Sequence, residues 1–427
     1  MKPEHQTRAG QTALDAPSAQ SATQRAMPTP SEKSRKRIAL IVPIPYRGGT
    51  LRGTVLLAQA LQAGARAAGQ EIEIVLGYRD DPGAYLPDSF DEFPNWVQRR
   101  PYHWTNFDAA TARRALAYAG REPHVMAPAY WVPEDGIAQF TDCDFWLVIS
   151  DRLEKPLLPL RPHALLVYDY IQRYESLLPK EADRAYAQAA RAAKRVFVTT
   201  EFTRRDAIQY AGVEPSRAVC LPMLVPTFTA PEIGPTATAD YFLWSTNLSI
   251  HKNHENAVRA LILYYNEYGG ELECRISGMG SEQLFKNNLP YLQALPALLR
   301  AAPLARRRIH PLGELPEPIY RKTVAEAAFV WHPCRVDNGT FSVAEAAAYR
   351  VPALSSDYPA MREMDAALGL NLAWMDAHAP ADMARALKHM ETCWRERRDL
   401  LPPVESLSAH GPQALGKFWW EAISQCL

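Results

Sequence analysis

The chain has 427 residues, and its 47 lysines and arginines balance its 47 aspartates and glutamates, so its formal net charge is zero. A neutral chain lacks the strong positive field of a nucleic-acid-binding protein, and an apolar content of 47% is typical of a soluble globular protein. Because 427 residues exceed one ordinary core, we expect two domains.

The cysteine and hydropathy patterns indicate the cellular compartment of the protein. The six cysteines include no CxxC pair, and no stretch of eighteen apolar residues occurs. The first pattern suits thiols in a reducing cytoplasm, and the second argues against a spanning helix. Residues 1–36 are rich in Gln, Ser, Thr, Ala and Pro and have no apolar segment long enough for a signal peptide. We therefore expect a cytoplasmic protein that begins with a disordered tail.

Residues 37–228 alternate between apolar runs and Ala-rich helical patterns. The first run is Ile38–Pro43, followed by a glycine-containing turn over 46–54 and a helix over 55–68. Continuous apolar runs of this length are typical of strands buried on both faces of a parallel sheet. Further strands are predicted at Ile72–Leu76, Phe145–Ile149, Ala164–Tyr168, Arg195–Thr199 and Ala218–Pro222. The alternation predicts a doubly wound α/β domain.

The pattern breaks and then begins again. Residues 229–239 have the Pro, Thr and Ala content of a linker, and residues 240–410 repeat the alternation. The expected strands of this second domain are Tyr241–Ser245, Glu273–Ser277, Arg308–Leu312, Ala328–His332 and Pro352–Ser355, with a helix over Asn253–Tyr268. Two Rossmann-like sheets facing one another would leave a central cleft. The aromatic stretch 411–427 predicts a final helix that packs back across the domain junction.

Residues 330–364 carry the strongest chemical signal. They predict a strand, a polar loop containing Asp337, a helix containing Glu345 and a second strand. The first N–H groups of a helix are unpaired and attract anions, and a carboxylate about two turns further in suits sugar hydroxyls. The stretch therefore indicates a ligand that has both a diphosphate and a polyol, such as a nucleotide sugar.

Several other segments place polar groups at strand ends. Gly48 and Gly49 follow the first strand, where the missing side chains let a ligand approach the backbone. Neighbouring Arg47 and Arg52 could add charge there, although exposed loop arginines are common. Lys252 lies in a turn before a helix, where it could meet a diphosphate or simply be solvated. Asp169 follows a strand and could position an acceptor or cap the next helix.

In their order, these segments resemble the GT-B glycosyltransferases of retaining family 4. The resemblance rests on YFLWSTNLSIHKNHENAVRAL, IHPLGELPEPIYRKTVAEAAFVWHPC and the Glu-x(7)-Glu-like stretch from Asp337 to Glu345. RVFVTTEFTRRDAIQYAGV and LLVYDYIQRYESLLP resemble the family's first domain. The resemblance covers about residues 38–427. It implies the GT-B fold, in which two Rossmann-like domains bind an acceptor and a nucleotide sugar.

The resemblance also assigns donor residues. It implies that Lys252 contacts the diphosphate and that Glu345 binds the ribose, with a salt bridge to a neighbouring arginine as the alternative for Glu345. Asn247 or His251 stands where the family often has an arginine. Asp337 replaces the usual glutamate, and the loop reads DNGTFSVAE where the family reads roughly EGFGLPxxE. The implied backbone donors to sugar and phosphate are Asn338, Gly339, Thr340 and Phe341, and Gly278 and Glu314 would lie beside the base.

On the acceptor side, Gly48 and Gly49 form the implied acceptor or phosphate loop, and Tyr168-Asp169 replaces a frequent His-Asp pair. Asp169, Lys252 and Asp337 are therefore the predicted catalytic residues. We expect no metal and no cofactor, because the chain lacks HExxH and metal-spaced cysteines. Its one DxD, at Asp142 to Asp144, precedes a strand and so should lie away from the cleft.

The sequence thus predicts a retaining glycosyltransferase that acts on a glycan or lipid-linked glycan, as in bacterial O-antigen, capsule or exopolysaccharide synthesis. A nucleotide-sugar epimerase, a phosphorylase of the same plan and a non-catalytic nucleotide-sugar-binding subunit remain alternatives. We predict no nucleic-acid partner. The pairs Arg99-Arg100 and Arg113-Arg114 could touch the inner face of a membrane, and ordinary solvated surface is the competing interpretation.

Overall fold

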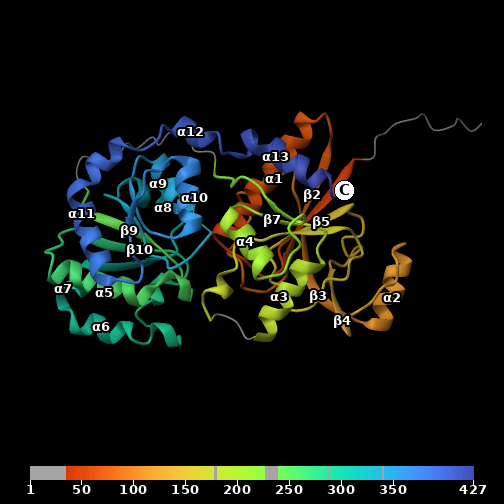
Figure 1. Cartoon of the computed structure of the whole chain (residues 1–427), viewed down its shortest axis with the longest axis horizontal. Helices are drawn as coiled ribbons and strands as arrows, with labels where there is room; N and C mark the ends of the chain where they lie inside the picture. Colours follow the sequence, from red (N-terminus) through yellow and green to blue (C-terminus); the bar gives the residue numbers. More distant parts are fainter. Residues whose placement is uncertain (1–34, 177–179, 227–238, 287, 339–340) are drawn as a thin grey trace, which may run out of the picture. The chain divides into compact units, whose positions relative to one another are not determined.

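The computed structural model describes residues 35–176, 180–226, 239–286, 288–338 and 341–427. The predicted tail over 1–36 and linker over 229–239 lie almost wholly outside the described residues. Within the compact unit Arg35–Leu427, the strands form two sheets with helices packed against them (Figure 1). The expectation of two Rossmann-like α/β domains is confirmed.

The first sheet has the order β4-β3-β2-β1-β5-β6-β7-β8. Its neighbouring strands are parallel except for the antiparallel edge pair β3–β4. Starting from β1, the chain adds β2 to β4 on one side of the sheet and then β5 to β8 on the other side. The position between β1 and β5 is therefore the topological switch point of a doubly wound sheet. The strands are β1 Lys36–Ile41, β2 Ile72–Arg79, β3 Gln98–Asp108, β4 Ala129–Glu134, β5 Phe145–Ile149, β6 His163–Leu166, β7 Val196–Val198 and β8 Ala218–Cys220.

The second sheet has the order β11-β10-β9-β12-β13-β14 and is parallel throughout. Its switch point lies between β9 and β12. The strands are β9 Tyr241–Ser245, β10 Glu273–Ser277, β11 Ile309–Gly313, β12 Val330–His332, β13 Ala353–Ser356 and β14 Ala373–Met375.

Helices cover both faces of each sheet. On the first sheet, α1 (Gly49–Ala67) and α13 (Pro412–Ser424) pack on one face, and α2 (Ala109–Tyr118), α3 (Lys180–Ala192) and α4 (Glu201–Gln209) pack on the other. On the second, one face carries α5 (His254–Asn266), α6 (Leu295–Ala301), α7 (Pro303–Arg308) and α11 (Pro380–Asp399). The other carries α8 (Glu317–Ala325), α9 (Phe341–Ala348), α10 (Pro359–Leu368) and α12 (Val404–Ser408). Short 3₁₀ turns are η1 Ile171–Arg173, η2 Ile250–Lys252, η3 Ser281–Gln283 and η4 Pro290–Leu292.

Central strands form where the sequence is apolar without interruption. All five residues of β5, FWLVI, are buried, because helices cover the sheet on both sides. Three strands were not predicted: the edge strands β4 and β14, and β3, which lies next to β4. β3 reads QRRPYHWTNFD and alternates between exposed and buried positions, so its polar residues and its proline hide the strand signal.

The C-terminal helix α13 packs directly against α1. A methyl group at Gly64 of α1 would lie 2.1 Å from the carbonyl oxygen of Gly416, so the two helix backbones are in contact. Trp419 and Trp420 are buried beside this crossing, and Trp419 Nε1 donates to the carbonyl of Pro222 at 3.1 Å. The chain therefore returns, after α12 on the second sheet, to the helical layer of the first sheet.

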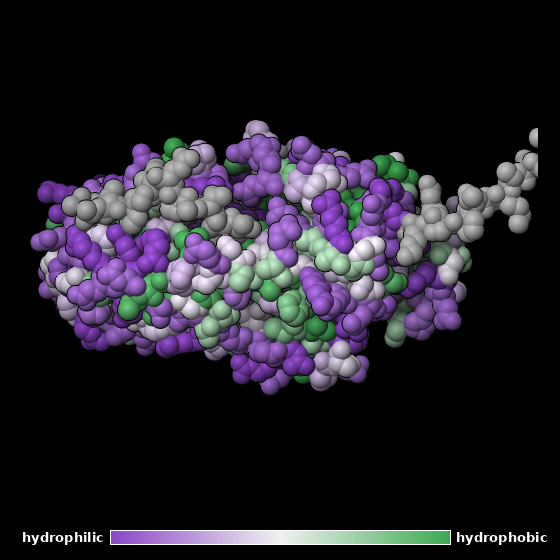
Figure 2. Space-filling view, turned by 90° about the horizontal axis from the view of Figure 1, so that it is seen from above, coloured by the Kyte–Doolittle hydropathy of each residue, from purple (hydrophilic) through white to green (hydrophobic). Residues whose placement is uncertain are grey.

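On the face shown in Figure 2, hydrophobic residues gather in the middle of the view, with hydrophilic residues around them. Among the residues that the structure describes, no helix has the length and apolar content needed to cross a bilayer. Exposed apolar side chains such as Tyr118, Met126 and Ile137 belong to the first domain's α2–β4–β5 region.

Candidate functional site

The predicted site residues follow strands at or near the two switch points. Gly48 and Gly49 follow β1, and Asp169 follows β6. Lys252 follows β9 in the second sheet, and Asp337 follows β12 beside it. Ligands of doubly wound folds bind at these carboxyl ends, because the loops diverge there and leave room between them.

Lys252 and Asp337 form a buried ion pair at the second switch point. Lys252 Nζ lies 2.5 Å from Asp337 Oδ2, and the two side chains are only 13% and 14% exposed. The other carboxylate oxygen of Asp337 accepts the backbone N–H of Asn338 at 2.8 Å. The ammonium and the carboxylate are therefore both held in place.

The turn that carries Lys252 is fixed by its neighbour Asn253. Asn253 adopts the left-handed conformation (φ 62°), and its Nδ2 donates to the carbonyls of Pro333 at 3.0 Å and Ala377 at 2.8 Å. The N–H of Arg335 also donates to the carbonyl of His251. These bonds join the loops after β9, β12 and β14, so the Lys252–Asp337 geometry follows from the backbone of three strands.

Electrostatics keeps this pair charged. Burial would raise the pKa of Asp337, but Lys252 and nearby imidazoles lower it to about 2. Burial would likewise lower the pKa of Lys252, and the facing carboxylate raises it instead. Burial, followed by the charge of Lys252, lowers the pKa of His251 and His332 to about 3, so both imidazoles are neutral near pH 7. The ammonium is thus a permanent cation at the end of β9.

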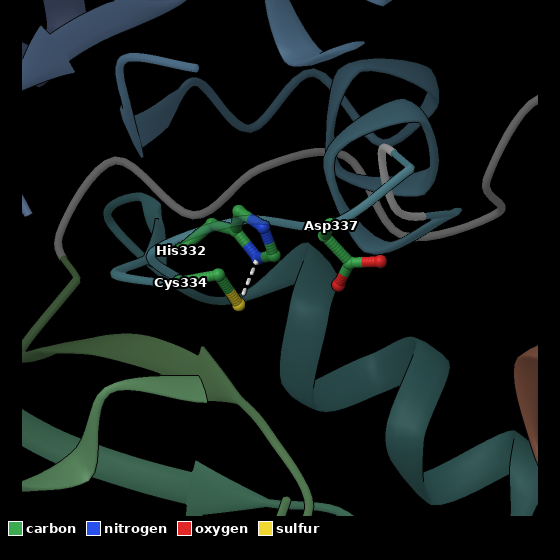
Figure 3. Close-up of side chains that lie close together, drawn as sticks. All are labelled: His332, Cys334 and Asp337. Carbon is green, nitrogen blue, oxygen red and sulfur yellow. Dashed lines mark hydrogen bonds between the residues drawn. The ribbon is translucent and has the colours of Figure 1, made fainter. Parts of the chain in front are cut away.

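Cys334 and Asp337 lie on the loop after β12, and His332, the last residue of that strand, lies beside them, as Figure 3 shows. The candidate ligand atoms of these three residues lie within 4.8 Å of one another, so they are the side chains that could hold a metal in the described part of the chain. His332 Nδ1 and Cys334 Sγ are 3.7 Å apart, and burial raises the pKa of the Cys334 thiol to about 12. A neutral thiol next to a lysine ammonium is a poor metal site, because a divalent ion would have to displace the proton and overcome the lysine charge.

The loop after Asp337 is tied to the first domain. The buried side chain of Asn338 accepts hydrogen bonds from Thr200 at 3.0 Å and Thr203 at 2.9 Å, and donates to Thr199 at 2.7 Å. The backbone N–H of Asn338 was one of the predicted donors to the sugar or phosphate. In the structure it donates instead to Asp337. Gly339 and Thr340 lie outside the described residues.

Phe341 begins α9 and packs against the apolar cluster of the first sheet. A methyl group at Gly49 would lie 3.8 Å from its ring. The predicted phosphate loop and the start of α9 are therefore neighbours. Gly48, with φ 61° and ψ −132°, adopts a conformation that glycine favours, and a Cβ there would meet no atom within 4 Å.

Glu345 lies on α9 and is 6% exposed. It forms an ion pair with Arg52 of α1, and Tyr320 donates to its second oxygen at 3.3 Å. Arg52 also pairs with Glu317 at 2.7 Å. Burial raises the pKa of Glu345, and Arg52 opposes that shift. The sequence analysis gave two interpretations of Glu345, ribose binding and a salt bridge to an arginine, and the structure contains the salt bridge.

A cavity of about 660 Å³ borders this ion pair. Its lining includes Arg52 and Gln59 from α1, Tyr320 from α8, Glu345 from α9 and Tyr349 directly after α9. The volume is within the range of small-molecule sites. Glu345 is therefore accessible from a cavity that both domains line.

The remaining donor-side residues lie at the ends of β9, β10 and β11. A methyl group at Gly278 would approach the carbonyl of Thr246 to 1.9 Å, so only glycine fits there, and its N–H donates to the carbonyl of Gly313. Asn247 accepts the N–H of Ser249 at 3.0 Å. Glu314 is partly exposed and lies 3.8 Å from Arg47 of the first domain.

Asp169 lies in a polar cluster that the sequence analysis did not identify. Arg152, from the loop after β5, is 3.6 Å from Asp169 and 3.8 Å from Asp151. Burial raises the pKa of Asp169, with Arg152 opposing and Asp337 adding to the shift. Burial also raises the pKa of Asp151 to about 6. Because the end of β5 was predicted exactly, the polar triplet Ser150-Asp151-Arg152 that follows it was the available signal.

Comparisons with known proteins support the fold. No family model matches the chain, and no curated protein sequence matches it. Solved structures do match: a glycosyltransferase from Rickettsia africae, at 10% identity and a TM-score of 0.61, covers 92% of this chain and 98% of its own.

The descriptions of two further matching structures name sugars or a sugar-transfer activity. The HepE protein of Anabaena, in complex with UDP and glucose, is 13% identical with a TM-score of 0.60, covering 92% of this chain and 99% of its own. A lipopolysaccharide outer core galactosyltransferase is 14% identical with a TM-score of 0.58, covering 92% and 100%. At such low identities these similarities establish architecture alone: the chain has the GT-B fold.

Proposed function

We propose that this protein is a glycosyltransferase that moves a sugar from a nucleoside diphosphate donor to a glycan or lipid-linked glycan. The observation that carries the proposal is the buried Lys252–Asp337 pair at the β9/β12 switch point of a GT-B fold. A fixed cation at this edge is what a departing diphosphate requires, because its negative charge increases as the glycosidic bond breaks.

The donor would lie on the second domain. Lys252 would face the diphosphate together with the first N–H groups of α9, while Glu345 would accept the ribose hydroxyls. Gly278 and Glu314 would border the base. In this arrangement Lys252 replaces a divalent ion, so we propose that the reaction needs neither metal nor cofactor.

The acceptor would enter from the first domain, with Asp169 and the Gly48-Gly49 turn nearest to it. The bond between the sugar's anomeric carbon and the diphosphate oxygen breaks, and a bond from that carbon to the acceptor oxygen forms. The family resemblance supports retention of configuration, with the acceptor's proton passing to the departing diphosphate.

UDP is the first donor base to test, because the similar Anabaena protein was solved with UDP and glucose. A role in bacterial surface polysaccharide synthesis is supported by the likeness to the lipopolysaccharide galactosyltransferase and by the family resemblance. We propose a location in the cytoplasm, where nucleotide sugars are available, with peripheral membrane contact if the acceptor is lipid-linked.

Binding and product analysis test this function together. A panel of nucleoside diphosphate sugars should raise the melting temperature selectively, since a ligand that binds only the folded state stabilises it. Glu345→Gln should raise the Kd of the best-binding donor by tenfold or more, whereas Glu405→Gln on α12, away from the site, should leave that Kd unchanged. Transfer to an acceptor supports a transferase, a changed free sugar nucleotide indicates an epimerase, and binding without turnover indicates a non-catalytic subunit.

A further inference from the structure

A second polar hollow lies in the first domain, away from the switch point. Its volume is about 280 Å³, and its lining combines Arg121, Arg161, His163 and Lys194 with two prolines and one alanine. His163 is the first residue of β6, and Lys194 follows α3. Because Asp169 follows the other end of β6, this hollow and the proposed acceptor site lie at opposite ends of one strand.

The lining contains three permanent cations and no carboxylate. Arg161 is held by the backbone, because its Nε donates to the carbonyl of Thr141 at 2.7 Å. Lys194 Nζ similarly donates to the carbonyl of Cys426 at 3.0 Å. Carbonyl groups orient these side chains without neutralising them. Within the described residues, Arg121 forms no ion pair, and its neighbour Glu122 does not line the hollow.

This concentration of positive charge contrasts with the zero net charge of the whole chain. The arginines at the switch points illustrate the contrast: Arg52 pairs with Glu345 and Glu317, and Arg152 faces Asp151 and Asp169. His163 is 6% exposed, and burial, followed by the charge of Arg121, lowers its pKa to about 4. The imidazole is therefore neutral near pH 7 and adds neither a fourth positive charge nor a counter-ion to the hollow.

We propose that this hollow binds a phosphate-bearing anion. A guanidinium offers paired N–H donors that match phosphate oxygens, and the lysine ammonium adds a compact charge. The anchored Arg161 and Lys194 would need little reorganisation, and the exposed Arg121 would close over the ligand. The phosphate could belong to a free phosphate ester or to the headgroup of a membrane phospholipid.

The test uses the full chain and two pairs of charge-removing substitutions. Inorganic phosphate and glycerol phosphate are titrated at constant ionic strength while heat of binding and melting temperature are recorded. The variant is Arg121→Gln with Lys194→Gln, both exposed side chains. The matched control is Arg306→Gln with Arg307→Gln, which removes two exposed charges from α7 on the second sheet.

We expect saturable phosphate binding by the wild type, unchanged binding by the control, and a Kd at least tenfold higher for Arg121→Gln/Lys194→Gln, because two charge-assisted contacts are lost. A parallel assay with phosphatidylcholine vesicles, with and without phosphatidylglycerol, separates the two sources. Binding only to phosphatidylglycerol vesicles that the variant loses and the control keeps assigns the site to a lipid headgroup. Binding of the free esters without vesicle binding assigns it to a soluble ester.

The proposal is overturned if neither phosphate source binds saturably, or if the variant and the control bind each source equally well. Donor binding provides an independent readout. The Arg121→Gln/Lys194→Gln variant should bind a nucleotide sugar as the wild type does, because its substitutions lie at the opposite end of β6 from Asp169. Failure of one site therefore leaves the other unaffected.

Discussion

At the scale of single residues, the buried carboxylates are kept in place by cations that come from distant parts of the chain. Glu345 is paired with Arg52, almost three hundred positions earlier, and Asp337 with Lys252. A buried charge without a partner is costly, so each pairing is also a constraint on the donor site. A ribose that binds Glu345 has to share that carboxylate with Arg52 or displace it.

Arg52→Gln should therefore separate stability from ligand binding. We expect the variant to lose about 3 kcal/mol of unfolding free energy, because removing one partner leaves Glu345 buried and unpaired. At the same time a nucleoside diphosphate should stabilise the variant more than the wild type, since its ribose no longer competes with the guanidinium. Urea unfolding with and without the ligand measures both quantities.

The matched control for this experiment is Arg321→Gln. The side chain of Arg321 is 55% exposed and also pairs with Glu317. Exposed pairs contribute little, so its cost should remain below about 1 kcal/mol. Equal ligand stabilisation of wild type and Arg52→Gln would show that Arg52 does not compete for Glu345.

At the scale of elements, the α1–α13 crossing depends on two glycines. Gly64 and Gly416 let the helix backbones touch, which places Trp419 and Trp420 against the core of the first sheet. Because α13 follows the second domain in the chain, this crossing also links the end of the second domain to the first. Glycine is otherwise unfavourable within a helix, so close packing is the physical reason for its presence at these positions.

Gly64→Ala should lower the free energy of unfolding by about 3 kcal/mol, because a methyl group that overlaps the Gly416 carbonyl forces the helices apart. Gly49→Ala in the same helix is the control, since its Cβ would be in ordinary contact at 3.8 Å from Phe341. Thermal unfolding followed by circular dichroism provides the comparison. Equal stability of the two variants would show that α13 is not tightly seated.

Most strands could be predicted from sequence, including the edge strands β8 and β11, whereas β3, β4, β14 and the tertiary partners could not. Phe145–Ile149, Tyr241–Ser245 and Glu273–Ser277 were predicted with the observed bounds. The first two are apolar or nearly so, as strands covered on both faces are, whereas Glu273–Ser277 was predicted from its place in the strand–helix alternation. Strands β3, β4 and β14 carry weaker patterns.

The partners of the candidate site were harder to identify than the site residues. The loop positions of Lys252 and Asp337 could be predicted from the sequence. Their ion pair could not, because the tertiary fold brings together residues that are far apart in the chain. The contacts of Glu345 with Arg52, and of Asn338 with Thr199, Thr200 and Thr203, join residues from different domains. No local pattern contains that information.

At the scale of the whole molecule, polar contacts connect the two domains. Arg335 forms an ion pair with Glu175 at 2.5 Å, and Glu363 of α10 accepts the first N–H groups of α4, from Glu201 at 2.6 Å and Phe202 at 2.9 Å. Any domain movement during turnover would have to exchange these contacts for contacts with substrate or water.

The pH dependence of stability is also a property of the whole molecule. Burial lowers the pKa of His163 and His254 to about 4 and of His251 and His332 to about 3, from an ordinary value of 6.5. Below pH 6.5 the unfolded chain binds protons that the folded chain excludes, so stability should fall as the pH falls toward 4. Each such histidine contributes a slope of about 1.4 kcal/mol per pH unit, and carboxylates with raised pKa values, such as Asp151, offset part of it.

Urea unfolding at pH 7.5, 6.0 and 5.0 measures this slope. His332→Gln should reduce it by about 1.4 kcal/mol per pH unit, whereas His378→Gln, at an exposed position, should leave it unchanged. Stability that is independent of pH over this range would contradict the neutral, buried state of these imidazoles.

The central claim is that Lys252 stabilises a departing diphosphate. It is tested most directly by the rate at which diphosphate is released from the best-binding nucleotide sugar. Lys252→Met should reduce that rate by about 10²–10³-fold, as expected when one preorganised electrostatic contact is lost. Lys417→Met, which removes an exposed lysine of α13, should retain the wild-type rate. Release by Lys252→Met at the wild-type rate would contradict the account.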